Sequence, residues 1–270
     1  MKFIFILVIF FSNIIFASDD EITLNVPTKS SVSFRGFRFS DEATGFDTSY
    51  SYGLKSGGSL GVGIGSEANQ LDEKYRTNSL QLFGSKDLSD DFSLNGYTWR
   101  TSVSDHFTKQ SSRITLDYFL NEIVLTGGAL LQRWDFQSTL ANVSNQKLSS
   151  AGWSARIAFE QLWPYTLELS RDQYLYQETQ LQEFNSFALS DISNSEVYRI
   201  PQWIQSIKIS YQGHIVGSYI NVDESDQVAD NEKFKSVTFG LQYYWNKQWI
   251  LEIDASDQDY KSLGLSYFWY

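Results

Sequence analysis

Residues 236 to 245 read Ser-Val-Thr-Phe-Gly-Leu-Gln-Tyr-Tyr-Trp, with apolar side chains at every second position from Val237 to Trp245. Successive side chains of a β-strand point to opposite faces, so this stretch predicts a strand with one apolar and one polar face. The same alternation returns at residues 113 to 120 and 153 to 160. No long segment after the first residues has the period of an amphipathic helix. The sequence therefore predicts an all-β fold.

Runs of this kind recur along almost the whole chain and predict about fourteen strands, within a range of twelve to sixteen. The predicted ranges are 31 to 40, 48 to 55, 59 to 67, 76 to 86, 92 to 103, 111 to 120, 123 to 136, 151 to 162, 165 to 176, 203 to 212, 214 to 222, 233 to 245, 249 to 257 and 261 to 269. Pro27, Pro164 and Pro201 fall outside these ranges, as expected if every strand pairs on both sides.

The predicted connections fall into two classes that alternate along the chain. Short turns, such as 121 to 122 and 212 to 213, follow every even-numbered strand. Mostly longer polar loops, of which 177 to 202 is the longest, follow every odd-numbered strand. Turns on one rim and loops on the other are typical of a transmembrane antiparallel up-and-down β-barrel with its turns on the periplasmic side.

Composition excludes several classes of function. The chain has 270 residues, a net charge of -11, no Cys and two His. An acidic chain offers no basic surface for nucleic acid. Without Cys there are no disulfides, thiolate metal sites or cysteine nucleophiles. No phosphate-binding loop or zinc spacing appears, so we expect no cofactor and no metal.

The first residues have the pattern of an export signal. Lys2 precedes an apolar run from Phe3 to Phe11, and Ile14 to Ala17 complete the apolar stretch before a polar segment begins. This order predicts a signal peptide over residues 1 to 17, too short for a membrane-spanning helix. Residues 18 to 30 would then form a short periplasmic segment and 31 to 270 the barrel. We expect the mature protein in the outer membrane of a Gram-negative bacterium.

The tryptophans cluster near the predicted strand ends. Trp163, Trp245, Trp249 and Trp269 lie at the expected periplasmic rim, Trp134, Trp153 and Trp203 at the loop rim, and Trp99 two-thirds of the way towards it. Trp prefers the level of lipid headgroups, so this distribution predicts the two aromatic girdles of a membrane barrel.

The last predicted strand carries a short motif. Ser262, Gly264, Tyr267 and Trp269 match the order polar, any, Gly, any, any, aromatic, any, aromatic. This resembles the assembly signal of bacterial outer-membrane β-barrel proteins, with the departure that Tyr270 follows the final aromatic. Length and strand number resemble those of small monomeric fourteen-stranded porins. The resemblance implies recognition by the barrel-assembly machinery, contact with outer-membrane lipid and lipopolysaccharide, and passive diffusion of small hydrophilic solutes.

The polar face of the predicted strands is expected to line the lumen. Its charged residues are Glu67, Arg100, Arg113, Asp117, Arg133, Asp135, Arg156, Glu160, Glu168, Asp172, Lys208, Glu252 and Asp254. Such charges either set a field that selects ions and polar solutes, or pair across the interior and close it. The excess of acids over bases predicts a weak preference for cations.

Two loops stand out by their composition. The loop at 177 to 202 is rich in apolar residues, which fits a constriction folded inward or a contact surface outside. The loop at 223 to 232 carries five carboxylates, expected to be solvated, although clustered carboxylates also bind Ca²⁺ or Mg²⁺ that bridges lipopolysaccharide phosphates.

The alternatives to a channel are an enzyme and a structural barrel. A Ser-His pair needs both residues two apart on one strand face, but His106 is followed two later by Thr108 and His214 by Val216. We therefore expect no enzyme, and an outer-membrane hydrolase is the least favoured reading. A structural or adhesive barrel remains open, including an oligomer packed through small residues, namely Gly57, Gly58, Gly127, Gly128 and Ala129.

Overall fold

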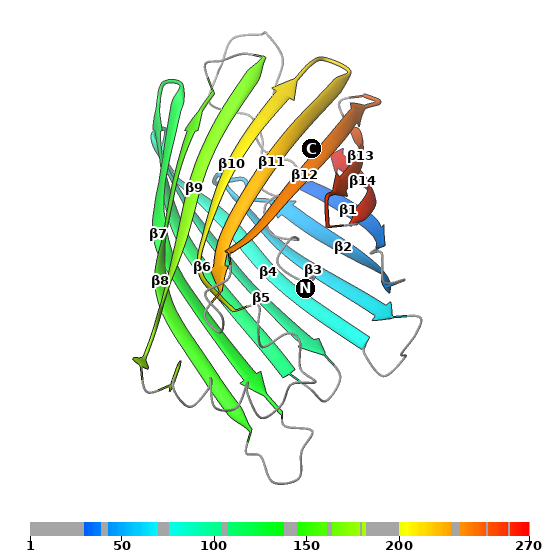
Figure 1. Ribbon diagram of the computed structural model, residues 1–270. Helices are drawn as coiled ribbons and strands as arrows, with labels where there is room; N and C mark the ends of the chain where they lie inside the picture. The colour runs from blue at the N-terminus through cyan, green and yellow to red at the C-terminus, as the bar shows by residue number, and fades with distance from the viewer. Residues whose placement is uncertain are drawn as a thin grey trace.

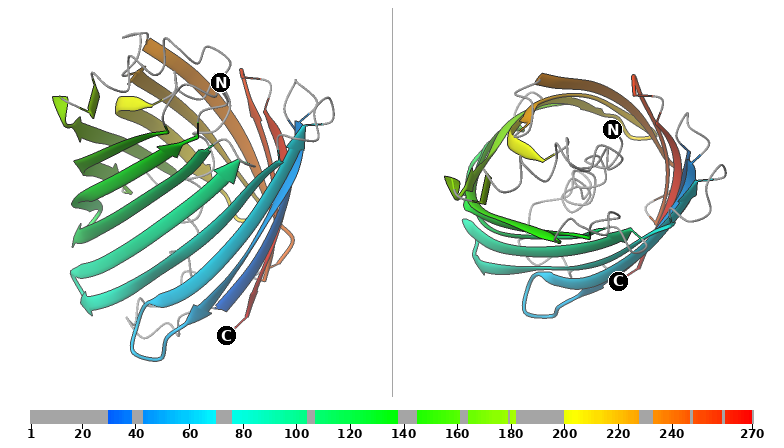
Figure 2. Two further views of the ribbon diagram at one scale, coloured as in Figure 1. Left: turned by 90° about the horizontal axis from the view of Figure 1, so that it is seen from below. Right: turned by 60° about the horizontal axis from the view of Figure 1, so that its bottom comes forward.

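The computed structural model describes residues 30–38, 43–69, 76–103, 107–137, 145–160, 164–178, 180–181, 200–227, 233–246, 248–258 and 260–269 (Figure 1). Fourteen antiparallel strands form one closed barrel in chain order, and β1 pairs with β14 to complete it (Figure 2). The predicted signal peptide, residues 1 to 17, lies outside these residues. No helix among the described residues is long and apolar enough to span a membrane.

The strands match the predicted set one for one, with some ends displaced. They are β1 (Ser30–Arg38), β2 (Ala43–Gly53), β3 (Ser59–Asn69), β4 (Arg76–Ser89), β5 (Phe92–Val103), β6 (Phe107–Leu120), β7 (Ile123–Phe136), β8 (Gln146–Phe159), β9 (Tyr165–Tyr176), β10 (Pro201–Gln212), β11 (Val216–Gln227), β12 (Lys233–Tyr244), β13 (Trp249–Ser256) and β14 (Lys261–Trp269).

The largest differences lie at the loop ends of the strands. β11 continues to Gln227, so Asp223, Glu224 and Asp226 belong to a strand, and the prediction of a loop from residue 223 was wrong. Pro201 is the first residue of β10 rather than part of a loop, a place where a missing N–H is tolerated. At these ends the backbone pairing continues beyond the last alternating apolar residue. Strand ends predicted from the alternation therefore came too early.

The strand ends that the short turns join lie together on one rim of the barrel (Figure 1). Asn121, in the two-residue turn between β6 and β7, has a positive φ of 49°, which Asn tolerates better than most residues. Gly57 and Gly58 have positive φ in the turn between β2 and β3. These two glycines therefore serve the turn and offer no flat strand surface for an oligomer.

The two faces of the wall differ sharply in the half of the barrel nearest the turns. Apolar side chains point outward, and Ile114, Ile209 and Leu263 are 60%, 53% and 55% exposed. Polar side chains such as Asn95, Thr115 and Ser262 point inward and are buried. An apolar band around the whole outside needs a lipid environment, so the fold is that of a membrane barrel.

The aromatic girdles are only partly as predicted. Trp249 and Trp269 lie at the turn ends of β13 and β14, and Trp203 lies on the outer face near the loop end of β10. Trp153 is also on the outer face but lies in the middle of β8, so its predicted place at the loop rim was wrong. Trp99 and Trp134 instead point into the barrel and are 5% and 3% exposed, so they are not headgroup anchors as predicted. Trp163 lies outside the described residues.

Candidate functional site

The inner wall carries side chains of both charges. Its strand residues include the acids Asp47, Glu67, Asp117, Glu168, Asp172, Asp223, Glu252 and Asp254 and the bases Arg35, Lys109, Arg113, Arg156 and Lys208. Nine of the predicted lumen-lining residues belong to this set, namely Glu67, Arg113, Asp117, Arg156, Glu168, Asp172, Lys208, Glu252 and Asp254. Most of them fall into two groups on different sectors of the wall.

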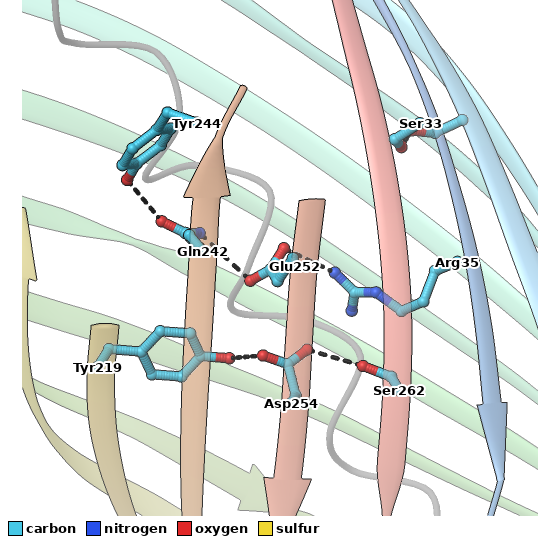
Figure 3. Close-up of polar contacts among 9 residues, drawn as sticks. Ser33, Arg35, Tyr219, Gln242, Tyr244, Glu252, Asp254 and Ser262 are labelled. Atoms are coloured by element: carbon cyan, nitrogen blue, oxygen red, sulfur yellow. Dashed lines mark hydrogen bonds and ion pairs between the residues drawn. The ribbon is translucent and has the colours of Figure 1, made fainter. Parts of the chain in front are cut away.

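The first group lies where β14 meets β1, and we call it the seam cluster: Arg35, Tyr219, Gln242, Tyr244, Glu252, Asp254 and Ser262 (Figure 3). Arg35 Nη2 pairs with Glu252 Oε2 at 3.5 Å, with side-chain exposures of 6% and 9%. Tyr219 donates a 2.6 Å hydrogen bond to Asp254, which also accepts one of 2.8 Å from Ser262. These contacts join β1, β11, β13 and β14, so the cluster ties the closing strands together from inside.

Two glycines let side chains of the seam cluster reach across a strand. In the pairing register Gly264 lies between Arg35 and Glu252, and a Cβ there would stand 3.6 Å from Arg35 Nε. Gly240 lies between Tyr219 and Asp254, and a Cβ there would overlap the Tyr219 ring. The crossing at Gly240 is thus tight, whereas the crossing at Gly264 has room for one more carbon.

The second group lies on β6 to β9, and we call it the arginine cluster: Arg113, Asp117, Thr126, Ser154, Arg156, Glu168 and Asp172. Arg113 pairs with Asp172, which also accepts a 2.7 Å hydrogen bond from Ser154. Arg156 lies 3.7 Å from Asp117 and 3.6 Å from Glu168. The Arg113 and Arg156 side chains are 31% and 27% exposed, so this cluster faces the open interior.

Aromatic side chains line the inner wall near the loops. Lys109 Nζ lies 5.3 Å from the ring centre of Trp99 and 4.3 Å from that of Trp134. Phe136 stacks beside Trp134 at 6.0 Å between ring centres and is 1% exposed. A cation held against two indole faces is favoured by the ring quadrupoles, so Lys109 has a fixed place here.

Small residues line the inner face of β3 and parts of its neighbours. The inner positions of β3 include Gly61, Gly63 and Gly65, and β2 and β4 contribute Ser49 and Ser79 beside them. The Ser33 and Ser49 hydroxyl groups are 2.7 Å apart and lie against the wall. These small residues give β3 a low inner surface, over which larger neighbours such as Phe83 and Gln81 of β4 lie.

Three charges predicted to line the lumen lie on the outer face. Arg100 pairs across the sheet with Leu80, which points outward and is 46% exposed. Arg133 binds Asp135 at 3.1 Å, and both share the face of the outward Leu131. The reason is that towards the loops the inner face becomes aromatic and the outer face polar. The prediction assumed that the aromatic side chains of β5 and β7 face lipid along the whole strand, and it therefore assigned Arg100, Arg133 and Asp135 to the wrong face.

The sequence reading missed several inner residues. Arg35 follows Ser31 and Ser33 at intervals of two residues, and these polar residues alternate with Val32 and Phe34. This alternation could have predicted that Arg35 faces the lumen. Lys109 was missed because β6 begins at Phe107, four residues before the predicted start of this strand. Asp223 was assigned to a loop, although it accepts hydrogen bonds from Ser206 and Asn221 inside the barrel.

The remaining candidates lie at the rims or in the wall. Glu160 follows β8 at the turn rim, and burial raises the pKa of its carboxyl. Ser262, Gly264, Tyr267 and Trp269 all lie in β14, and the first two face the lumen. The exposed His214 lies in the turn after β10. Among the described residues no group of three His, Cys, Asp or Glu is placed to hold a metal ion.

Comparisons with known proteins support the barrel through structure alone. No protein-family model and no curated protein matches the sequence. The toluene transporter TodX of P. putida is 10% identical, with a TM-score of 0.54, and the match covers 91% of each chain. The monoaromatic hydrocarbon channel CymD is 10% identical, with a TM-score of 0.50 and coverage of 90% of this chain and 88% of that one. At such identity the likeness concerns the fold, and it confirms the predicted barrel.

Proposed function

We propose that this chain forms an outer-membrane channel for passive diffusion of small hydrophilic solutes or ions. The outside is apolar and suits lipid, while the inside carries hydroxyl, amide and charged groups that suit water. Interior width grows with strand number, and fourteen strands lie well above the eight that side chains can fill completely.

The observation that carries this proposal is that, among the described residues, the inner ion pairs join residues on nearby strands of the wall and not residues on opposite sides of the lumen. Arg35 and Glu252 belong to β1 and β13, two strands apart in the closed barrel. Arg113 and Asp172 belong to β6 and β9, three strands apart. Pairs this close around a ring of fourteen hold their side chains against the wall. They favour an open passage over an interior closed by pairs that cross it.

The charges along the passage suggest a modest preference for cations. More acids than bases face the interior among the described strand residues. A wet lumen lined mainly by carboxylates lowers the energy of cations relative to anions.

Planar-bilayer conductance of the detergent-folded protein in a salt gradient tests the proposal. We expect steady unitary steps and a reversal potential with the sign of cation preference. Silence from protein that migrates as a folded barrel on unheated gels would contradict the channel. It would favour the structural or adhesive barrel instead.

The cellular setting is part of the same proposal. We infer export through a cleaved signal peptide at residues 1 to 17 and residence in the outer membrane of a Gram-negative bacterium. Insertion would use the barrel-assembly machinery acting on the β14 motif of Ser262, Gly264, Tyr267 and Trp269. The outward Gly127 and Ala129 of β7 leave a homo-oligomer open. We propose no enzymatic activity and no cofactor.

A further inference from the structure

The outer wall of β9 to β12 has a row of polar and charged side chains. Arg171 pairs across the sheet with Gln205, Gln205 with Glu224, and Glu224 with Lys235. One row nearer the loops lie Gln173, Trp203, Asp226 and Lys233, paired in the same way. All eight side chains share the face that carries the apolar band nearer the turns.

The neighbouring row on the turn side is entirely apolar. Leu169, Ile207, Val222 and Val237 pair with one another in register and are between 38% and 50% exposed. A hollow of about 500 Å³ lies where the apolar and polar rows meet. Its outward-facing lining is Ala155, Ile157, Leu169, Arg171, Gln205, Ile207, Val222, Glu224 and Lys235. An apolar floor with a charged edge matches a lipid with acyl chains below an ionic headgroup.

The contacts in the row favour an anionic headgroup. Glu224 accepts a 3.1 Å hydrogen bond from Gln205 and lies 3.7 Å from Lys233 Nζ, so its charge is already balanced. Arg171 contacts only neutral groups among its described partners: it donates to Gln173 at 3.2 Å and lies 5.3 Å from the Trp203 ring centre. Arg171 and Lys235 thus supply positive charge at two corners of the hollow.

The outer face near the loops is basic around the whole barrel. The outer face here carries nine bases and only three acids among the described strand residues. The bases are Arg38, Arg76, Arg100, Arg133, Lys147, Arg171, Lys233, Lys235 and Lys261, and the acids are Asp135, Glu224 and Asp226. The chain as a whole has a net charge of -11, so this belt has the opposite sign to the rest of the molecule. Bases at the edge of an apolar band lie at the level of lipid headgroups, where phosphate is the prevailing anion.

We propose that the hollow on β8 to β12 binds a diphosphorylated glycolipid of the outer leaflet, with one phosphate at Arg171 and the other at Lys235. Three strand spacings separate these residues, about 14 Å between their backbones, which suits two phosphates better than one. The guanidinium of Arg171 binds a phosphate bidentately, and Trp203 packs at the same level. The inference rests on the proposed membrane placement and not on an open lumen.

Native mass spectrometry of the full barrel folded in neutral detergent tests the site, with synthetic diphosphoryl lipid A as the probe. Each base near an anionic lipid contributes roughly fivefold to binding, so we expect Arg171→Gln/Lys235→Gln to bind about 25-fold more weakly. The matched control is Lys55→Gln/Lys86→Gln at the turn rim, which removes one exposed and one half-buried base on the other side of the barrel and should bind as the unaltered chain does.

Further probes separate the sources of binding. Monophosphoryl lipid A should bind with intermediate affinity, and phosphatidylcholine and inorganic pyrophosphate should bind weakly. Equal binding of diphosphoryl lipid A to both double variants, or equal binding of phosphatidylcholine, would overturn the site. Each single variant is measured as well, so a folding defect in one double variant does not hide the result. Both double variants should keep the conductance of the unaltered chain, which separates this outcome from failure of the channel proposal.

Discussion

The seam cluster and the arginine cluster contain the same kinds of side chain in different surroundings. Arg35 and Glu252 at the seam are 6% and 9% exposed, whereas Arg113 and Asp172 are 31% and 14% exposed. Removing one partner of a buried ion pair costs several kcal/mol, while pairs accessible to water contribute little. The difference suggests that the seam cluster holds the barrel closed and the arginine cluster sets the field that solutes meet.

The location of the two clusters supports this division of roles. The seam cluster spans β11 to β1 and bridges the one junction that joins the two ends of the sheet. The arginine cluster lies on β6 to β9, where consecutive strands are already joined by turns. Side-chain ties add most where the chain provides no covalent link, so burial at the seam follows from topology.

The largest expected effect comes from Arg35→Ala. The change leaves Glu252 buried beside Asp254 without its ion-pair partner, and it also removes the base that pairs with Asp47 across the sheet. We expect a loss of about 3 kcal/mol in the free energy of unfolding, measured by urea titration in detergent or lipid vesicles. The conductance of protein that does fold should change little.

A second variant shows whether the loss comes from the unpaired charge. Arg35→Ala combined with Glu252→Gln removes both charges of the pair and should recover part of the stability. If the double variant were as unstable as the sum of the two single ones, the Arg35–Glu252 pair would have no special role at the seam.

Gly240→Ala should have the next largest effect, because a Cβ there overlaps the Tyr219 ring. The ring must move, which breaks its 2.6 Å hydrogen bond to the buried Asp254. Overpacking of this kind costs roughly 1 to 3 kcal/mol, again measured by urea unfolding. Tyr219→Phe keeps the ring and loses only the hydroxyl, so it should be less unstable than Gly240→Ala. The reverse order would show that the ring has free space.

The two clusters were unequally visible in the sequence. Asp117, Arg156 and Glu168 each lie between two outward apolar residues, so their face could be predicted, and Arg113 and Asp172 share that face at an even spacing along the same strands. Near the loops the alternation reverses, and the rings of Trp99 and Trp134 point inward while Arg100 and Arg133 point outward. A period of two identifies a strand without saying which face is inside, and only the neighbouring strands decide that.

Contacts across strands could not be predicted at all. Arg35 and Glu252 are 217 positions apart in sequence and meet only because β1 pairs with β14. The crossing of Arg35 over β14 depends on register, since a shift of one residue would place Leu263 or Leu265 and not Gly264 beside Arg35. The fourteen strands and their turns needed only local pattern, which is why they were predicted closely.

Asp172→Asn, in the arginine cluster, should have a small effect on stability and a measurable one on selectivity. Its partner Arg113 is partly exposed to solvent, so we expect a loss of no more than about 1 kcal/mol. Removing a lumen acid while keeping Arg113 should lower the preference for cations, and Arg113→Gln should raise it. Reversal potentials in a salt gradient measure both, and a shift of the same sign in both variants would contradict a direct role for these charges.

Gly264→Ala should change stability least, and it sharpens the contrast with Gly240→Ala in the neighbouring part of the seam. A Cβ at residue 264 would stand 3.6 Å from Arg35 Nε and 3.8 Å from Glu252 Cβ, both ordinary contacts. We expect urea unfolding to change by no more than about 0.5 kcal/mol. Gly264→Leu is the informative partner, because its longer side chain would block the path of Arg35 to Glu252 and should approach the instability of Arg35→Ala. Equal tolerance of Ala and Leu would mean that Arg35 reaches Glu252 by another route, and the glycine would then serve the assembly motif alone.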